Sequence, residues 1–221
     1  MYERVGDDVM TTLAPIDAYR LLAQNYDTNP NPLLTLEHRT MTLLFPPMRG
    51  ARVVDAAAGT GRWASFCRAR GARTVAVDFC QEMLASAPRP VVLADANRLP
   101  LPDGFADVTI CAFALGYAPS CLSELARVTR KGGAVLVSDV HPAAIRRGWT
   151  RSFRYGSEVI EVAHHSYALS DLVAASLKLD FLMERRFGRP EHEVFASAGK
   201  LASFEEAARH PAIFVARWTK A

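Results

Sequence analysis

The 221-residue chain has few cysteines, no large excess of one charge and no long apolar run. Its four cysteines include no C-x-x-C pair and no histidine at metal-ligand spacing, which favours reduced thiols over disulfides or a metal site. The 26 Lys and Arg residues nearly balance the 23 Asp and Glu residues, so no nucleic-acid surface is expected. No apolar stretch could span a membrane, and the polar N-terminus is unlike a signal peptide. We therefore expect a cytoplasmic protein with neither a membrane nor a nucleic-acid partner.

The apolar runs of the chain alternate with segments that have helical spacing. Half of the residues are hydrophobic, which is enough to build one core, and we predict a single domain over residues 1–221. Helical spacing marks segments such as 62–70 and 120–129, and apolar runs lie at 52–55, 74–77, 91–93, 107–112 and 134–139. This alternation predicts an α/β fold with a mainly parallel sheet and helices on both faces.

Both ends of this core carry additional segments. Residues 1–48 contain two stretches with helical spacing, at 16–23 and 33–44, and we predict an N-terminal helical cap there. Residues 141–169 break the alternation and are rich in rings, so we interpret them as an insertion that covers the substrate. After it we predict a helix that begins near 170–171, followed by strands near 178–186 and 212–218.

A glycine-rich turn is the most informative feature of the sequence. The apolar run Val53–Val54 leads through Asp55 into Ala-Ala-Ala-Gly-Thr-Gly, and a helical segment follows. Gly59 and Gly61 lack a Cβ, so the backbone there can adopt positive φ and approach a ligand closely. The next apolar run ends at Asp78, where a carboxylate can accept hydrogen bonds from both ribose hydroxyls of an adenosine. The turn alone also fits a nicotinamide dinucleotide, because it satisfies G-x-G-x-x-A.

The next two segments narrow the choice of cofactor. The run 91–93 is followed by Asp95, and Leu-Pro-Leu-Pro-Asp-Gly-Phe-Ala-Asp-Val occupies 99–108. With the turn and Asp78, this order resembles the class I S-adenosylmethionine-dependent methyltransferases, and the resemblance extends over about residues 20–221. It implies S-adenosylmethionine as cofactor and a Rossmann-like sheet of about seven strands, the last of which is antiparallel and lies between the fifth and the sixth.

The chain departs from the family pattern at two places. Ala57 replaces the usual first glycine of the turn, and Phe105 comes one position early, which leaves Ala106 before Asp107. Alanine is compatible with the turn when its φ is negative, so we expect negative φ at Ala57 and a site with slightly altered packing.

The resemblance also assigns cofactor contacts, because ligands of such sheets bind beyond the carboxyl ends of the strands. It places Asp78 on the ribose, Asp95 on the adenine amine and Met83 against the cofactor. A loop cap for Asp95 and a core role for Met83 are the alternatives. The complete predicted set is Asp55, Ala57, Gly59, Gly61, Asp78, Phe79, Met83, Asp95, Ala96 and Phe113.

Candidate catalytic residues follow from the chemistry of methyl transfer, which is an in-line displacement at a sulfonium methyl. The protein mainly positions the acceptor, and a base is needed only when the acceptor loses a proton. His141, at the end of the fifth predicted strand, is the first candidate, with a turn residue as the alternative. Tyr26, His38 and His164 are further candidates, of which Tyr26 lies in an A-x-x-Y-D passage that closes over the cofactor in related enzymes.

We therefore expect a small-molecule methyltransferase. The rings of the insertion favour an aromatic or heteroaromatic acceptor, and they are Trp149, Phe153, Tyr155 and Tyr167. In size and layout the chain is similar to bacterial tailoring enzymes of secondary metabolism. A nicotinamide-dependent oxidoreductase and a non-catalytic binding protein are the alternatives, and the sequence leaves the acceptor, the methylated atom and the oligomeric state open.

Overall fold

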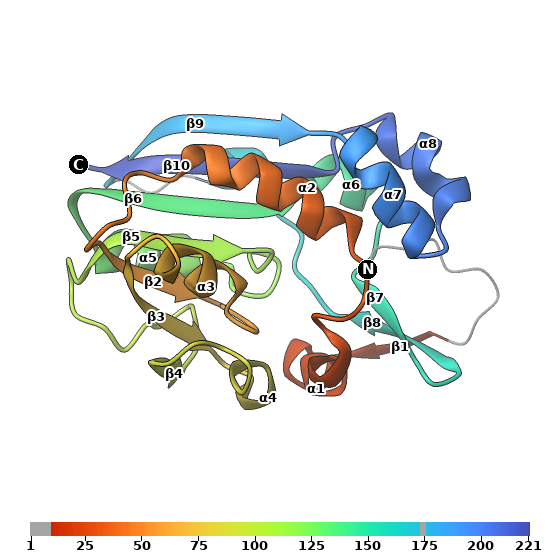
Figure 1. The fold of residues 1–221 in the computed structure, drawn as a ribbon, viewed down its shortest axis with the longest axis horizontal. Coiled ribbons are helices and arrows are strands. Elements are labelled where there is room, and N and C mark those ends of the chain that lie inside the picture. The colour runs from red at the N-terminus through yellow and green to blue at the C-terminus, as the bar shows by residue number, and fades with distance from the viewer. Residues whose placement is uncertain (1–9, 173–175) are drawn as a thin grey trace.

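The computed structural model describes residues 10–172 and 176–221, and its largest element is a sheet of seven strands. The strands lie in the order β4-β3-β2-β5-β6-β10-β9 (Figure 1). Their bounds are β2 (Arg52–Ala56), β3 (Arg73–Asp78), β4 (Val91–Leu93), β5 (Ala106–Ala112), β6 (Thr129–Val140), β9 (Leu177–Arg185) and β10 (Ile213–Lys220).

The pairing of these strands confirms the predicted fold class. Strands β4, β3, β2, β5 and β6 pair in parallel, with Val54 of β2 opposite Val75 of β3 and Thr109 of β5. Strand β10 is antiparallel to both β6 and β9 and lies between them. The central strands are buried on both faces, which explains why they read as continuous apolar runs.

Eight α-helices occur in the described part of the chain. They are α1 (Pro15–Leu22), α2 (Pro32–Met41), α3 (Arg62–Arg68), α4 (Gln81–Leu84), α5 (Cys121–Val128), α6 (Pro142–Arg146), α7 (Arg189–Ser197) and α8 (Phe204–Ala208). Short 3₁₀ turns are η1 (Ala23–Asn25), η2 (Thr42–Leu44), η3 (Leu169–Asp171) and η4 (Leu201–Ser203). The predicted helix near 170–171 begins as the turn η3, and residues 173–175, which it would include, lie outside the described residues.

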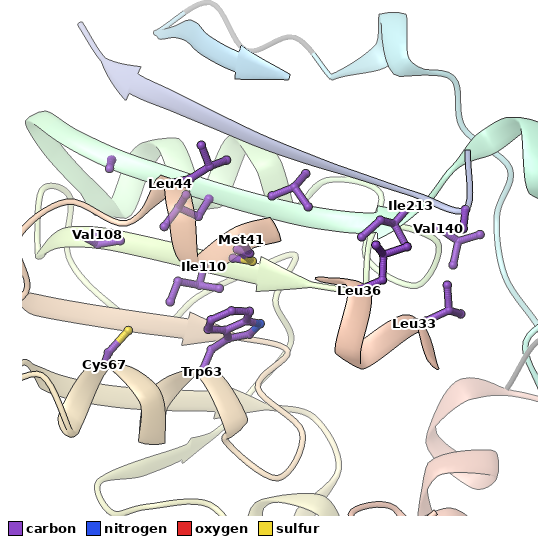
Figure 2. Close-up of a cluster of buried hydrophobic side chains, with 14 of the residues drawn as sticks. Leu33, Leu36, Met41, Leu44, Trp63, Cys67, Val108, Ile110, Val140 and Ile213 are labelled. Carbon is purple, nitrogen blue, oxygen red and sulfur yellow. The ribbon is translucent and has the colours of Figure 1, made fainter. Parts of the chain in front are cut away.

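Two apolar clusters hold the helices on opposite faces of the sheet. Helices α2 and α3 cover one face, where Trp63 and Met41 point toward Ile110 of β5 (Figure 2). Helix α5 covers the other face with Leu122 and Leu125. A fully buried side chain of this size stabilises the fold by about 1.5–3 kcal/mol relative to its exposure. Successive residues of a strand point to opposite faces of the sheet, so each strand contributes side chains to the packing of both helical layers.

A second sheet joins the N-terminal segment to the segment 141–169. It contains β1 (Met10–Leu13), β7 (Ser152–Tyr155) and β8 (Glu158–Val162) in the order β1-β8-β7. Strand β1 pairs in parallel with β8, and β7 and β8 form a hairpin. Ala18 of α1 packs against Phe153, Ile160 and Val162 of this sheet. In Figure 1 α1 lies beside this small sheet, whereas α2 lies along the main one.

The structure also describes the cysteines, the length of the helices and the clusters of possible metal ligands. The four cysteines are buried and free. Within the described residues, no helix is both long and apolar enough to cross a bilayer, and no cluster of three His, Cys, Asp or Glu side chains is arranged to hold a metal ion.

Candidate functional site

A cavity of about 610 Å³ lies beyond the carboxyl ends of β2, β3 and β5. Most of the predicted cofactor contacts line it, namely Asp55, Ala57, Gly59, Asp78, Phe79, Met83 and Phe113. Tyr19, Tyr26, Ala58, Thr60, Arg62, Trp63, Ala112, Ala114 and Tyr117 complete the wall. Parallel strands end on the same edge of a sheet, which is why residues far apart in the chain converge here.

Asp78, the last residue of β3, is held in a fixed orientation by the backbone. Its Oδ2 accepts a hydrogen bond from Gly59 N at 2.8 Å, and its Oδ1 accepts one from Cys80 N at 2.8 Å. Burial raises the pKa of this carboxyl group, and the backbone donors oppose that shift. Each carboxylate oxygen has a further lone pair, so Asp78 can still accept from ligand hydroxyl groups.

Asp55, the strand-end acid of β2, lies at the centre of the same edge. Its Oδ2 accepts a hydrogen bond from Ala64 N of α3 at 2.8 Å, so it connects β2 to the helix after the turn. Burial raises the pKa of Asp55 to about 7, while the Ala64 N–H and the charge of Arg62 oppose the rise. Asp55 therefore changes charge near neutral pH.

The two glycines of the turn have different surroundings. Gly59 has φ +57°, and a Cβ built on it would lie 3.1 Å from Met83 Cε. Gly61 has φ +76°, and its Cβ would lie 2.5 Å from Pro88 Cδ. Gly59 lines the cavity, whereas Gly61 is required by the loop that packs behind the turn.

The prediction of negative φ at Ala57 is wrong. Ala57 has φ +53°, and Phe113 at the end of β5 has φ +55°. Both residues line the cavity, and non-glycine residues in this conformation cost of order 1–3 kcal/mol. Ala57 therefore adopts the left-handed backbone conformation that glycine takes most readily.

Asp95 and Ala96 lie after β4 and do not belong to the wall of the cavity. The exposed Asp95 accepts hydrogen bonds at Oδ1 from Asn97 N at 2.8 Å and Asn97 Nδ2 at 3.0 Å, which is a loop cap. Ala96 is buried in the cluster beneath α5.

Of the four candidate catalytic residues, only Tyr26 reaches the cavity. His141 caps α6: its Nδ1 accepts from Ala143 N at 3.1 Å, and its Nε2 lies 2.8 Å from Glu184 Oε2. Burial lowers the pKa of His141. His141 is thus engaged on the β9 side of the fold.

The other two histidines also lie outside the cavity wall. His38 is exposed and stacks on Trp63, with ring centroids 5.3 Å apart. Partial burial lowers its pKa. His164 Nδ1 lies 3.2 Å from Val162 O at the end of β8.

A second cavity of about 710 Å³ adjoins the first. The two share Tyr19, Tyr26, Phe113 and Tyr117, and the second is also lined by Leu22, Asn29, Pro30, Asn31, Leu33, Leu34, Arg151, Ser152, Phe153 and Val162. Burial raises the pKa of Tyr19 and of Tyr117, and raises that of Tyr26 to about 12. These hydroxyl groups therefore stay protonated at neutral pH, and Tyr19 donates to Tyr117 at 3.2 Å.

Of the four rings expected to cover the substrate, Phe153 lines the second cavity. Trp149 stacks on Phe187 instead, with centroids 6.1 Å apart. Tyr155 is exposed, and Tyr167 donates from its hydroxyl to Val140 O at 2.6 Å.

A buried ion pair attaches the second sheet to the main one. Asp139 of β6 is fully buried, and Arg151, just before β7, contacts its Oδ1 through Nη2. Arg151 Nη1 also donates to Phe113 O at 2.6 Å, and its guanidinium lies 4.4 Å from the centre of the Tyr117 ring. Asp139 ends the predicted run 134–139, but the sequence gives no sign of this partner.

Glu37 on α2 is a buried acid that the sequence analysis did not identify. It accepts hydrogen bonds from Arg62 Nη2 at 2.5 Å, Trp63 Nε1 at 3.0 Å and Ser138 Oγ at 2.6 Å. A signal was available, because Glu37 lies between Leu36 and Thr40 on the buried face of α2. A lone acid on such a face requires buried donors.

Comparisons with known proteins agree with this geometry. Residues 54–137 match the family model described as a methyltransferase domain. The chain is 33% identical over 129 residues to a malonyl-acyl-carrier-protein O-methyltransferase of Yersinia pestis, covering 55% of this chain and 48% of the relative. It is 39% identical over 98 residues to a demethylmenaquinone methyltransferase of Beutenbergia cavernae, covering 41% of each. The matches thus span less than half of either relative.

Among solved structures, an S-adenosylmethionine-dependent methyltransferase from Mesorhizobium loti has a similar fold. Its TM-score is 0.65 at 19% identity, and the match covers 84% of this chain and 98% of that one. At this identity the likeness concerns the fold alone. The match to a methyltransferase domain and the shared fold together support a class I S-adenosylmethionine-dependent methyltransferase with S-adenosylmethionine as its cofactor.

Proposed function

We propose that the protein transfers a methyl group from S-adenosylmethionine to a small acceptor. The observation that carries this proposal is the wall shared by the two cavities, formed by Tyr19, Tyr26, Phe113 and Tyr117. A cofactor in the first cavity and an acceptor in the second would meet at this wall.

The residues around the first cavity suit this cofactor. Asp78 would accept from the ribose hydroxyls, and Gly59 leaves open the space that a side chain would fill. Phe79 and Met83 supply apolar contact beside Asp78. The bound cofactor supplies an electrophilic methyl group on a positively charged sulfur.

The residues of the shared wall would position the two reactants. Tyrosine rings and hydroxyl oxygens present partial negative charge to a sulfonium, and the surrounding apolar side chains limit the access of water. Such positioning is the main contribution that a protein makes to a displacement of this kind. Tyr26 is the one candidate catalytic residue at the wall, and its raised pKa suits orientation of an acceptor better than removal of a proton.

The second cavity favours an aromatic or heteroaromatic acceptor. Phe153 and the shared rings provide surfaces for stacking, while Asn29 and Asn31 provide amide groups. The names of the two relatives indicate chemically different acceptors. The proposed acceptor class therefore rests on the residues that line the second cavity. A cytoplasmic location and a role in secondary metabolism remain predictions from the sequence.

Calorimetric titration and a transfer assay together test the proposal. S-adenosylhomocysteine should bind and NAD should not, whereas the opposite result would support the oxidoreductase alternative. A screen with methyl-labelled cofactor against phenols, aromatic amines and indoles should then yield labelled product. Binding without transfer to any acceptor would favour the non-catalytic alternative.

A further inference from the structure

Arg62, the first residue of α3, has an unusual position at the cofactor cavity. It lines the cavity, and its guanidinium lies 4.7 Å from the centre of the Trp63 ring. Nη2 donates to Glu37, but Nη1 is buried and has no hydrogen-bond partner among the residues that the structure describes. A buried donor without a partner is costly, so a ligand that accepts from Nη1 would stabilise this arrangement.

Glu37 fixes the orientation of this guanidinium. The Glu37 carboxylate is fully buried and also accepts from Trp63 and from Ser138 of β6. Because α2, α3 and β6 all hold Glu37, the nitrogen of Arg62 that faces it cannot turn toward a ligand. Nη1 is left as the terminal donor that has no partner among the described residues.

The acidic and basic side chains around the cavity lie at different positions along the sheet. Among the described lining residues, the charged ones are Asp55, Asp78 and Arg62. Asp78 ends β3, whereas the Glu37–Arg62 pair is anchored on β6, two strands beyond β2. The cation therefore lies away from the proposed ribose site, toward the part of the cavity that the other end of an elongated ligand would occupy.

We propose that Arg62 binds the carboxylate of the aminoacyl part of the cofactor and that Glu37 positions it. This inference rests on the proposed function, since it assigns one end of the same ligand. An arginine nitrogen and a carboxylate form a charge-assisted hydrogen bond, which is stronger than a neutral one. The pair also sets the direction of the ligand, with its adenosine at Asp78 and its sulfur at the tyrosine wall.

Two ligands that differ in the aminoacyl group test this assignment by calorimetry. S-adenosylhomocysteine has the carboxylate, and 5′-methylthioadenosine lacks the aminoacyl group. In Arg62→Gln the affinity for S-adenosylhomocysteine should fall about 10- to 100-fold, as expected for a lost charge-assisted contact, whereas the affinity for 5′-methylthioadenosine should change less than about twofold. Arg62→Lys keeps a cation for Glu37. It should still lose most of the preference for S-adenosylhomocysteine over 5′-methylthioadenosine.

Arg68→Gln is the matched control, because Arg68 lies on the same helix and donates to Thr74 outside the cavity. It should leave both affinities unchanged. An equal loss for both ligands in the two Arg62 variants would overturn the proposal by showing a structural role only. Unchanged affinity for S-adenosylhomocysteine would overturn it as well. If the wild-type protein bound neither ligand, the proposed function itself would fail, and the inference with it.

Discussion

The two cavities share a wall but are held together in different ways. The turns after β2 and β3 form the cofactor cavity, and backbone N–H groups of Gly59, Cys80 and Ala64 fix its two acids. Segments from α1, residues 29–34, the end of β5 and the start of β7 line the proposed acceptor cavity, and the Arg151–Asp139 pair ties the segment before β7 to β6. The comparison indicates that local backbone geometry shapes the first cavity, whereas a long-range side-chain contact shapes the second.

The largest effect should come from filling the cofactor cavity. Gly59→Val should abolish binding of S-adenosylhomocysteine in calorimetry, because its side chain would occupy ligand space close to Met83 at a positive φ. Gly199→Val is the matched control, since Gly199 also has positive φ (+70°) but open space around it. Retained affinity in Gly59→Val would show that the turn is only structural.

Breaking the ion pair should test how the acceptor cavity is held. Arg151→Ala leaves the fully buried Asp139 without this cation, and loss of one partner of a buried pair costs about 3–5 kcal/mol of unfolding free energy. Denaturant unfolding measures this loss. Arg209→Ala removes an exposed pair with Glu206 and should have almost no effect. A similar small effect in both variants would contradict the proposed attachment.

Removing the predicted ribose acceptor should have a smaller effect, confined to the cofactor. Asp78→Ala should weaken binding of S-adenosylhomocysteine by about 1.5–3 kcal/mol, because a charged acceptor is lost from a partly enclosed site. Asp78→Asn, which retains one acceptor oxygen, should lose less. The assignment fails if the dissociation constant of Asp78→Ala equals that of the wild type.

The smallest effect is expected at His141, which lies outside both cavities. As a helix cap, His141→Ala should cost about 1 kcal/mol of unfolding free energy and leave kcat nearly unchanged. A general base would behave differently, because its loss should lower kcat by roughly 10²-fold or more at constant cofactor affinity. Steady-state kinetics of this variant, once an acceptor is known, therefore decide between the two roles.

The sequence predicted the cofactor side of the fold well because its signals are local. The buried strands read as apolar runs, so β2, β3, β4 and β5 lie within one residue of their predicted bounds. The second sheet was missed because β1 has four residues and pairs with β8, about 150 positions away. No local pattern can encode that pairing.

Individual residues show the same limit. The φ of Ala57 was mispredicted because the sequence does not show how the turn contacts a neighbouring strand, where Ala58 N donates to Val77 O of β3. His141 was chosen for its place at a strand end, but the direction of its side chain depends on Glu184 of β9, far along the chain. A strand-end position thus locates a residue on the correct edge of the sheet without fixing where its side chain points.

Because burial raises the pKa of Asp55 to about 7, cofactor binding should be coupled to proton exchange at this carboxyl group. A ligand that brings positive charge near Asp55 favours the ionised carboxylate, so the pKa falls and a proton leaves for the buffer. At neutral pH the measured heat of binding S-adenosylmethionine should then vary with the ionisation enthalpy of the buffer. In Asp55→Asn this variation should vanish. Cofactor occupancy would thereby depend on pH, since the proton and the cofactor compete for one protein state.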